Sequence, residues 1–242
     1  MKKTLVMCII GLMALAGCKK DEEKTKDTIK ISNGTSVTLY SGDRHQISAS
    51  SISAISYSSG NDFCAKVNST GQVTANHVGN TSISLRNNDD TKSVRVTVKA
   101  ESNLYTEPRI SFGDSKSTVE SKLGTPDEIN NGNYFYRNYS SVVDLLMVSF
   151  ENGKVEGYAL SVKTSYASEL GTFLFERYAY YGEIDDYLMY GNAFSVSDAT
   201  KLVGVRTNYS YIAVMYIPNL SSKGNVIMGE MNDILTKNVM QE

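Results

Sequence analysis

Hydrophobic and polar positions divide the chain into three parts, and the first is an apolar run near the N-terminus. Residues 5–17 carry no charged side chain and follow Met1-Lys2-Lys3. A helix of this length cannot cross a hydrocarbon layer of about 30 Å, which takes about 20 residues. A basic start followed by a short apolar run therefore predicts a signal peptide over residues 1–17.

From residue 28 to residue 100, short runs in which alternate residues are apolar recur between Asn-Gly, Ser-Gly and Gly-Asn pairs. Alternation places one face of each run in a core and the other in water. Many short strands with regular turn signals are typical of a β-sandwich, so this part is predicted to be all-β. The runs are residues 29–31, 36–39, 45–49, 55–57, 65–67, 72–75, 81–85 and 94–98.

Residues 101–242 differ in composition and are predicted to form a separate unit with its own core. They hold all three prolines and most of the 16 tyrosines and seven phenylalanines. A short helix is predicted after Gly113, with Asp114 or Ser115 as its cap and Gly124 at its end.

The remaining pattern of residues 101–242 mixes strands and helices. A helix, a turn and a meander, approximately repeated, predict an α+β domain with an antiparallel sheet and helices on one face. Strands are expected at 134–139, 142–150, 155–162, 202–206 and 209–217, helices at 166–180, from 195 and at 226–239, and a polar turn at 182–186.

Leu15-Ala16-Gly17-Cys18 resembles the lipobox of bacterial lipoproteins. The resemblance implies cleavage before Cys18, diacylglycerol on its sulfur and an acylated amine, which together anchor the chain to the outer membrane. Loss of Lys2 and Lys3 with the leader would take the formal charge from −2 to −4. The alternative is a plain secretory leader followed by a chance cysteine.

Residues 19–27 lack apolar side chains, so residues 18–27 are predicted to be a lipidated cysteine and a solvated tether. Lys20-Asp21-Glu22 also resembles the export signal of Bacteroidetes surface lipoproteins. That resemblance implies display on the cell surface, facing the medium. The alternative is a polar spacer that faces the periplasm.

Three segments of the all-β part, Tyr57–Asn61, Ala65–Ala75 and Gly79–Ile83, resemble the group 2 bacterial immunoglobulin-like (Ig-like) domain. The resemblance covers residues 28–100 and places Gly71 where a hairpin needs positive φ. Tyr57 stands where the family usually has tryptophan. Such domains are spacers and adhesive modules on cell surfaces, so the resemblance implies a role in binding.

In the second part, the string from Gly113 to Pro126, with Phe150–Val155 downstream, resembles the SmpA/OmlA outer-membrane lipoproteins and β-lactamase-inhibitor-like folds. These families bind proteins and are not enzymes.

Residues suited to catalysis or to cofactor binding are few. The two histidines, His45 and His77, both precede residue 101 and are expected at the surface, so residues 101–242 have no imidazole for a nucleophilic relay. Once Cys8 leaves with the leader and Cys18 is acylated, Cys64 is a lone thiol, expected to be a buried apolar residue. No metal site, cofactor or catalytic activity is predicted. A pI of 5.8 argues against nucleic acid as a partner.

One segment combines carboxylates with aromatic residues. Glu176, Glu183, Asp185 and Asp186 lie near five tyrosines between residues 178 and 190. A glycosidase needs two carboxylates across a sugar, and adjacent residues of an extended chain point to opposite sides. A solvated acidic turn is therefore favoured over a carbohydrate-active site.

The tyrosines of this segment allow two interpretations. Tyr181, Tyr187 and Tyr190 could form an exposed platform for a sugar or a protein, because a phenol offers a large area with a polar tip. The other interpretation, which is favoured for most of them, is that they are half-buried core residues beside Leu188 and Phe173. The sequence thus favours a binding or adhesion module for a protein or glycan ligand, with a carbohydrate-active enzyme or a structural spacer as alternatives.

Overall fold

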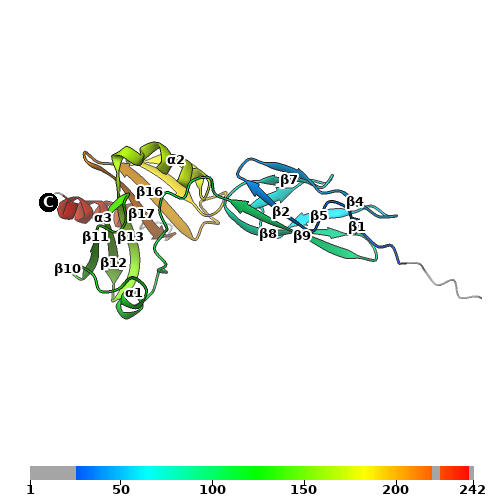
Figure 1. The fold of residues 1–242 in the computed structure, drawn as a ribbon. Coiled ribbons are helices and arrows are strands. Elements are labelled where there is room, and N and C mark those ends of the chain that lie inside the picture. The colour runs from blue at the N-terminus through cyan, green and yellow to red at the C-terminus, as the bar shows by residue number, and fades with distance from the viewer. Residues whose placement is uncertain (1–25, 220–223, 240–242) are drawn as a thin grey trace, which may run out of the picture.

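The computed structural model describes residues 26–219 and 224–239. An Ig-like β region is followed by a larger C-terminal domain built on an eight-stranded sheet (Figure 1). The described chain begins at the end of the Ig-like region that points away from the C-terminal domain. The signal peptide, Cys18 and the acidic residues of the proposed export signal lie outside the described residues, so those expectations remain predictions.

The Ig-like region is a sandwich of two sheets, as the alternating runs predict. One sheet has the order β2-β9-β8-β5 and the other the order β3-β7-β6, while β1 pairs with β4. Val73, Ile83 and Val96 are fully buried between the sheets. The strands are β1 (Lys30–Ile31), β2 (Ser36–Tyr40), β3 (Arg44–Gln46), β4 (Ala49–Ser50), β5 (Ser56–Ser59), β6 (Ala65–Val67), β7 (Gln72–Ala75), β8 (Gly79–Arg86) and β9 (Thr91–Lys99).

Gly71 occupies the hairpin between β6 and β7 with φ of 81°, as expected. A Cβ atom at this position would lie 2.9 Å from ring carbons of Tyr57. The tyrosine that replaces the family's usual tryptophan therefore packs directly over the hairpin, where only glycine leaves it room.

The prediction of a solvated tether ending at residue 27 is wrong for Asp27, whose side chain is buried. Its carboxylate accepts hydrogen bonds from the Ile52 amide at 2.9 Å and from the amide and hydroxyl of Ser53 at 2.8 and 2.5 Å. A charged residue can be buried when its oxygens are satisfied in this way, a condition that composition alone does not reveal. Asp27 thus ties the start of the domain to the loop after β4.

These bonds predict a pH dependence for the Ig-like region. The Ser53 hydroxyl and the Ile52 amide lower the pKa of Asp27 from 3.8 to about 2. A depressed carboxyl pKa stabilises the fold above the unfolded value, so this contribution is lost as the pH falls from about 4 to about 2. The melting temperature of the natural chain should therefore fall more steeply between pH 5 and pH 2 than that of Asp27→Asn. Equal slopes would contradict this assignment.

The C-terminal domain contains two successive units, each a helix followed by four antiparallel strands. Strand order is β10-β11-β12-β13-β17-β16-β15-β14, so the last strands of the two units, β13 and β17, pair at the centre of the sheet. The first unit is α1 (Lys116–Leu123), β10 (Glu128–Asn130), β11 (Asn133–Arg137), β12 (Val143–Glu151) and β13 (Lys154–Lys163), and the second is α2 (Ala167–Phe175), β14 (Ala179–Ile184), β15 (Tyr187–Gly191), β16 (Lys201–Thr207) and β17 (Tyr211–Pro218). The α+β class with an antiparallel sheet is confirmed.

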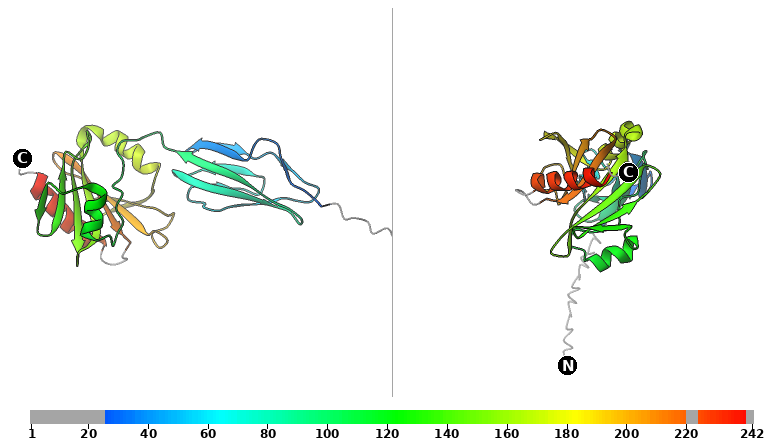
Figure 2. Two further views of the ribbon diagram at one scale, coloured as in Figure 1. Left: turned by 60° about the horizontal axis from the view of Figure 1, so that its bottom comes forward. Right: turned by 90° about the vertical axis from the view of Figure 1, so that its left-hand side faces the viewer.

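The expectation that all helices share one face of the sheet is wrong. α1 and α2 pack on one face, and the last helix, α3 (Gly224–Val239), packs on the other (Figure 2). Small residues on the strands make room for it, because Gly204 and Gly157 each lie against a methionine sulfur of α3, from Met228 and Met231 respectively. The face of the sheet on which α3 packs depends on this fit between distant segments. The helical pattern of residues 226–239 does not contain that information.

Three local predictions between residues 164 and 199 are also wrong. The helix expected over 166–180 is a short 3-10 turn, Thr164–Tyr166, followed by α2, which ends at Phe175. The polar turn expected at 182–186 is part of a hairpin whose two-residue loop, Asp185 and Asp186, has positive φ at both positions. Residues 195–199 form a turn and not a helix.

Candidate functional site

The junction between the Ig-like region and the C-terminal domain is held by Glu176, which follows α2. Its carbonyl accepts a hydrogen bond from the Val78 amide at 2.7 Å. Its buried carboxylate accepts bonds from the amides of Glu101 at 2.8 Å and Ser102 at 3.2 Å. One residue of the C-terminal domain thus binds both the Ig-like region and the segment that connects the two parts.

Aromatic rings form a second contact across this junction. The His77 ring stacks on Phe63 with ring centres 4.0 Å apart, and Phe194 of the C-terminal domain lies 5.2 Å from Phe63. His77 is half-buried, so its expected surface position is wrong. Burial lowers the pKa of His77 below 6.5, which favours the neutral ring at physiological pH.

A cleft of about 490 Å³ opens beside these contacts and is the candidate functional site. Three separate segments of the chain contribute to it: the residue before β8, the connecting segment, and α2 with the residues that follow it. The lining residues are Val78, Asn103, Tyr105, Thr106, Glu107, Arg109, Phe173, Arg177 and Tyr178.

Two arginines line the cleft, and one of them, Arg177, is ion-paired with Glu176 at 3.4 Å. Arg177 lies 3.8 Å from the centre of the Phe173 ring and donates to the Ser102 carbonyl at 2.9 Å, so it is fixed in place. Arg109 is exposed, and its side chain has no hydrogen bond or ion pair to any residue that the structure describes. Arg109 is therefore available to a ligand, whereas Arg177 shapes the wall.

The cleft is also lined by a hydrogen-bonded group around Glu107. The Tyr178 hydroxyl donates to this carboxylate at 2.5 Å, and the Lys201 ammonium lies 3.2 Å from its second oxygen. Burial, followed by the charge of Glu107, raises the pKa of Tyr178 far above its ordinary value. The phenol therefore stays protonated and acts as a donor, so this group stabilises the site without supplying a base.

Hydrogen-bonding groups converge with a free guanidinium in this cleft, while its aromatic residues, Tyr105, Phe173 and Tyr178, are buried in its wall. Such a set can bind a carboxylate that carries neighbouring polar groups, because arginine matches carboxylate geometry and Asn103 and Thr106 are exposed beside it. The cleft is not evident from the sequence. Its residues lie in segments around 78, 103–109 and 173–178, and no local motif links them.

The tyrosines proposed as a ligand platform lie elsewhere. Tyr187 and Tyr190 are 6% and 3% exposed and belong to the clusters on opposite faces of the sheet. Tyr181 is half-buried, and its hydroxyl donates to the Ala193 carbonyl at 2.6 Å. These side chains are thus part of the core and do not form an exposed platform, because β14 and β15 fold back as a hairpin of the sheet.

The four carboxylates of the same segment are not brought together either. Glu176 is engaged at the junction, while Glu183, Asp185 and Asp186 are exposed at the end of the β14–β15 hairpin. Among the residues that the structure describes, no group of three His, Cys, Asp or Glu side chains has metal-binding geometry. Within the same ranges, the helices are too short or too polar to cross a membrane.

Comparison with known proteins identifies the N-terminal region. Residues 25–98 match the bacterial Ig-like domain of group 2, which indicates a surface or adhesion-type module of the cell envelope. No curated protein sequence matches the chain.

Two solved structures are distantly similar to the chain. A cysteine-rich secretory protein from Staphylococcus aureus is 12% identical with a TM-score of 0.26, and 46% of each chain is covered. The chain therefore spans about half the length of that protein. An intimin mutant from EHEC O157:H7 is 14% identical with a TM-score of 0.27, over 77% of this chain and 97% of that one. Similarity at this level says nothing about the function of the present chain.

Proposed function

We propose that the protein is a lipid-anchored outer-membrane protein of the cell surface that binds a protein or glycan ligand through its C-terminal domain. The observation that carries the proposal is the order of parts along the molecule. The start of the described chain and the C-terminal domain lie at opposite ends of the Ig-like region (Figure 1). A chain held at Cys18 would therefore present the C-terminal domain away from the membrane, with the Ig-like region as spacer.

The junction contacts support presentation in a defined orientation. Glu176 fixes the connecting segment through the amides of Glu101 and Ser102, and Val78 bonds to its carbonyl. Buried hydrogen bonds to a charged group are each worth about 1.5–3 kcal/mol, so the two parts are held together more firmly than by a flexible linker. The cleft beside these contacts then has a fixed shape for a ligand.

The chemistry of the cleft supports binding without turnover. Arg109, Asn103 and Thr106 are exposed on its rim, while Glu107 is engaged by Tyr178 and Lys201. A protein loop with an acidic side chain or an acidic sugar would complement such a rim. The resemblance of the segment from Gly113 to Val155 to the SmpA/OmlA lipoproteins favours a protein among these ligands.

Reversing the charge of Arg109 should weaken ligand binding about tenfold or more, because an ion pair would become a like-charge contact. The mature chain, with Cys18 omitted, would first be applied to arrays of surface proteins and glycans. The captured ligand would then be titrated against the natural chain, Arg109→Glu and Arg44→Glu. Arg44 is an exposed arginine of β3 outside the cleft, so it provides a control with the same change in charge.

The natural chain and Arg44→Glu should bind alike, and Arg109→Glu should not. Equal loss in the two variants would mean that overall charge governs binding, which would contradict a specific role for the cleft. Unchanged affinity of Arg109→Glu would also contradict it.

A further inference from the structure

The outer face of the four-stranded Ig-like sheet has a charge pattern unlike that of the chain as a whole. Strands β2, β5, β8 and β9 contain no aspartate or glutamate, although the chain has a formal charge of −2. The basic residues at the outward positions of this sheet are Arg86, Arg95 and Lys99, whereas Lys92 pairs with the buried Leu85 on the other side of β9 and is ion-paired with Asp90. Apart from these, the outward positions carry mainly serine, threonine and asparagine, so this face is basic and rich in hydroxyl groups.

Arg95 lies at the centre of this face, between two serines. In the register of the sheet it pairs with Ser36 of β2 on one side and Ser82 of β8 on the other. Arg95 is exposed, and its guanidinium has no ion pair or hydrogen bond to any residue within the described ranges. Because neighbouring side chains leave it unneutralised, Arg95 can receive an anion from solution.

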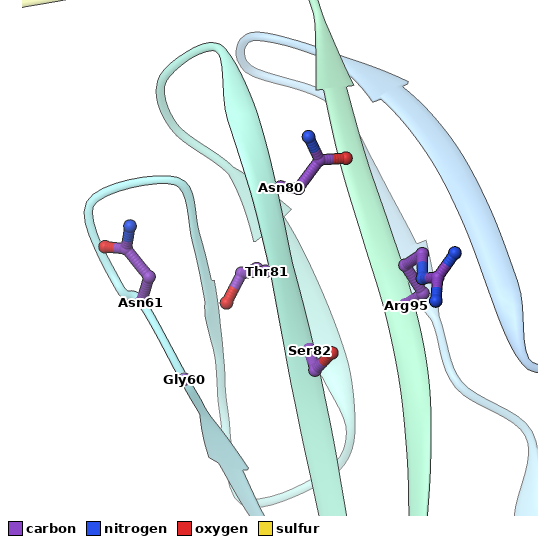
Figure 3. Close-up of a pocket in the computed structure, with 6 residues that line it drawn as sticks. All are labelled: Gly60, Asn61, Asn80, Thr81, Ser82 and Arg95. Carbon is purple, nitrogen blue, oxygen red and sulfur yellow. The ribbon is translucent and has the colours of Figure 1, made fainter.

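Hollows on both sides of Arg95 leave room for such a ligand. β5 pairs with β8 only as far as Ser59, after which the chain turns away and the Gly60 amide bonds to the Ser82 carbonyl at 2.9 Å. The end of β5 therefore leaves a hollow of about 550 Å³ beside β8 (Figure 3). It is lined by Gly60, Asn61, Asn80, Thr81, Ser82 and Arg95.

A second hollow, of about 420 Å³, lies on the other side of the same arginine. It is lined by Thr35, Ser36, Ser82, Ser93 and Arg95, so Arg95 and Ser82 belong to both hollows. In the first hollow, the Asn80 side chain is held in place because its oxygen accepts a hydrogen bond from the Thr97 hydroxyl at 2.8 Å. The Asn80 amide nitrogen remains as a donor toward a ligand.

We propose that this face binds an acidic polysaccharide, with a carboxylate of a uronic acid on Arg95 and sugar hydroxyls on Ser82, Asn80 and Asn61. Arginine binds carboxylates through two parallel hydrogen bonds, and hydroxyl and amide groups complement the hydroxyls of a sugar. The site is separate from the cleft of the proposed function and lies on the other part of the molecule.

A polymer fits this face better than a single sugar. Arg86 pairs with Thr91 of β9, and Lys99 is the last residue of the same strand, so the two basic side chains flank Arg95 at intervals of four residues. Four residues of strand span about 13 Å. Tyr40, which is 44% exposed, pairs with Lys99 and adds an aromatic surface at that end.

A protein partner is less favoured by the same observations. Interfaces between proteins concentrate their binding energy in buried aromatic and apolar anchors. Both hollows beside Arg95 are lined by polar residues and glycine only, and they offer no pocket for such an anchor.

The test is affinity electrophoresis of the mature chain, with Cys18 omitted, in gels that contain polygalacturonate or neutral dextran. Polygalacturonate should retard the natural chain and dextran should not. Arg95→Glu should raise the apparent dissociation constant about tenfold or more, and Arg95→Lys should have an intermediate effect because it keeps the charge and loses the planar fork. Arg44→Glu, on the opposite sheet, should behave as the natural chain does.

Several outcomes would overturn the proposal. Equal weakening by Arg44→Glu and Arg95→Glu would reveal general charge attraction, and unchanged retardation of Arg95→Glu would place the site elsewhere. Binding to vesicles that contain phosphatidylglycerol, without retardation by polygalacturonate, would assign the face to a lipid headgroup. Capture of a protein by this face without retardation by polygalacturonate would assign it to a protein. Arg109→Glu should be retarded as the natural chain is. A failure of the proposed ligand binding at the cleft would therefore be distinguishable from a failure of the polysaccharide site.

Discussion

Replacing Tyr190 with alanine should lower the free energy of unfolding of the C-terminal domain by about 3–5 kcal/mol, the usual cost of truncating a large buried aromatic residue. Tyr190 is 3% exposed. Its ring centre lies 5.2 Å from that of Tyr180 and 5.9 Å from that of Phe175, so truncation would leave a cavity beneath two aromatic side chains. Most domains have a total stability of only about 5–15 kcal/mol, and such a loss would bring this one close to unfolding.

Urea unfolding followed by circular dichroism would measure this effect, with Tyr209→Ala as the matched control. Tyr209 is fully exposed in the β16–β17 loop, and its truncation should change stability by less than about 0.5 kcal/mol. If Tyr190→Ala were as stable as Tyr209→Ala, the side chain would be dispensable to the core. The interpretation of Tyr190 as part of an exposed ligand platform would then regain support.

The Ig-like region could be predicted from its sequence because its determinants are local. A period of two in the apolar residues fixes which face of each strand is buried, and turn residues mark where the strands end. Gly71 is an example, since its positive φ follows from its place in a hairpin. The first helix of the C-terminal domain could also be predicted from local residues. The Ser115 side chain accepts a hydrogen bond from the Thr118 amide at its start, and Gly124 ends it.

The errors lie where distant segments decide the structure. The chain from 179 to 191 carries tyrosines at spacings that fit either a helix or a strand, and it is a hairpin because β15 pairs with β16. The loop of this hairpin uses Asp185-Asp186 where Asn-Gly would have been recognisable. Likewise, the side of the sheet that α3 covers depends on Gly157 and Gly204.

The candidate cleft is likewise formed by contacts between segments that are distant in the sequence. Val78, Arg109 and Tyr178 come together only because Glu176 binds the connecting segment to the end of α2. In the sequence, nothing distinguishes Glu176 from the three acidic residues near it. Its role at the junction becomes visible only when the positions of the Glu101 and Ser102 amides are known.

Replacing Cys18 with alanine should release the protein from membranes almost completely and should prevent cleavage of the leader after Gly17. The sulfur of Cys18 would carry diacylglycerol, and each buried methylene of a lipid chain contributes about 0.8 kcal/mol to membrane attachment. A chain without the sulfur would keep only its polar residues 19–27 at the membrane surface. Fractionation of cells, followed by mass determination of the processed chain, would measure both effects. Normal membrane retention of Cys18→Ala would contradict lipidation at this residue.

The most direct test of the central claim, display of the C-terminal domain outside the cell, is labelling of intact cells with a membrane-impermeant maleimide at Tyr209→Cys. The background should be low, because Cys8 is predicted to leave with the leader and Cys18 to be acylated, while burial raises the pKa of the Cys64 thiol. Tyr209→Cys should be labelled on intact cells, and the natural chain should not be labelled. Labelling of Tyr209→Cys only after the outer membrane has been permeabilised would contradict it and would place the domain in the periplasm.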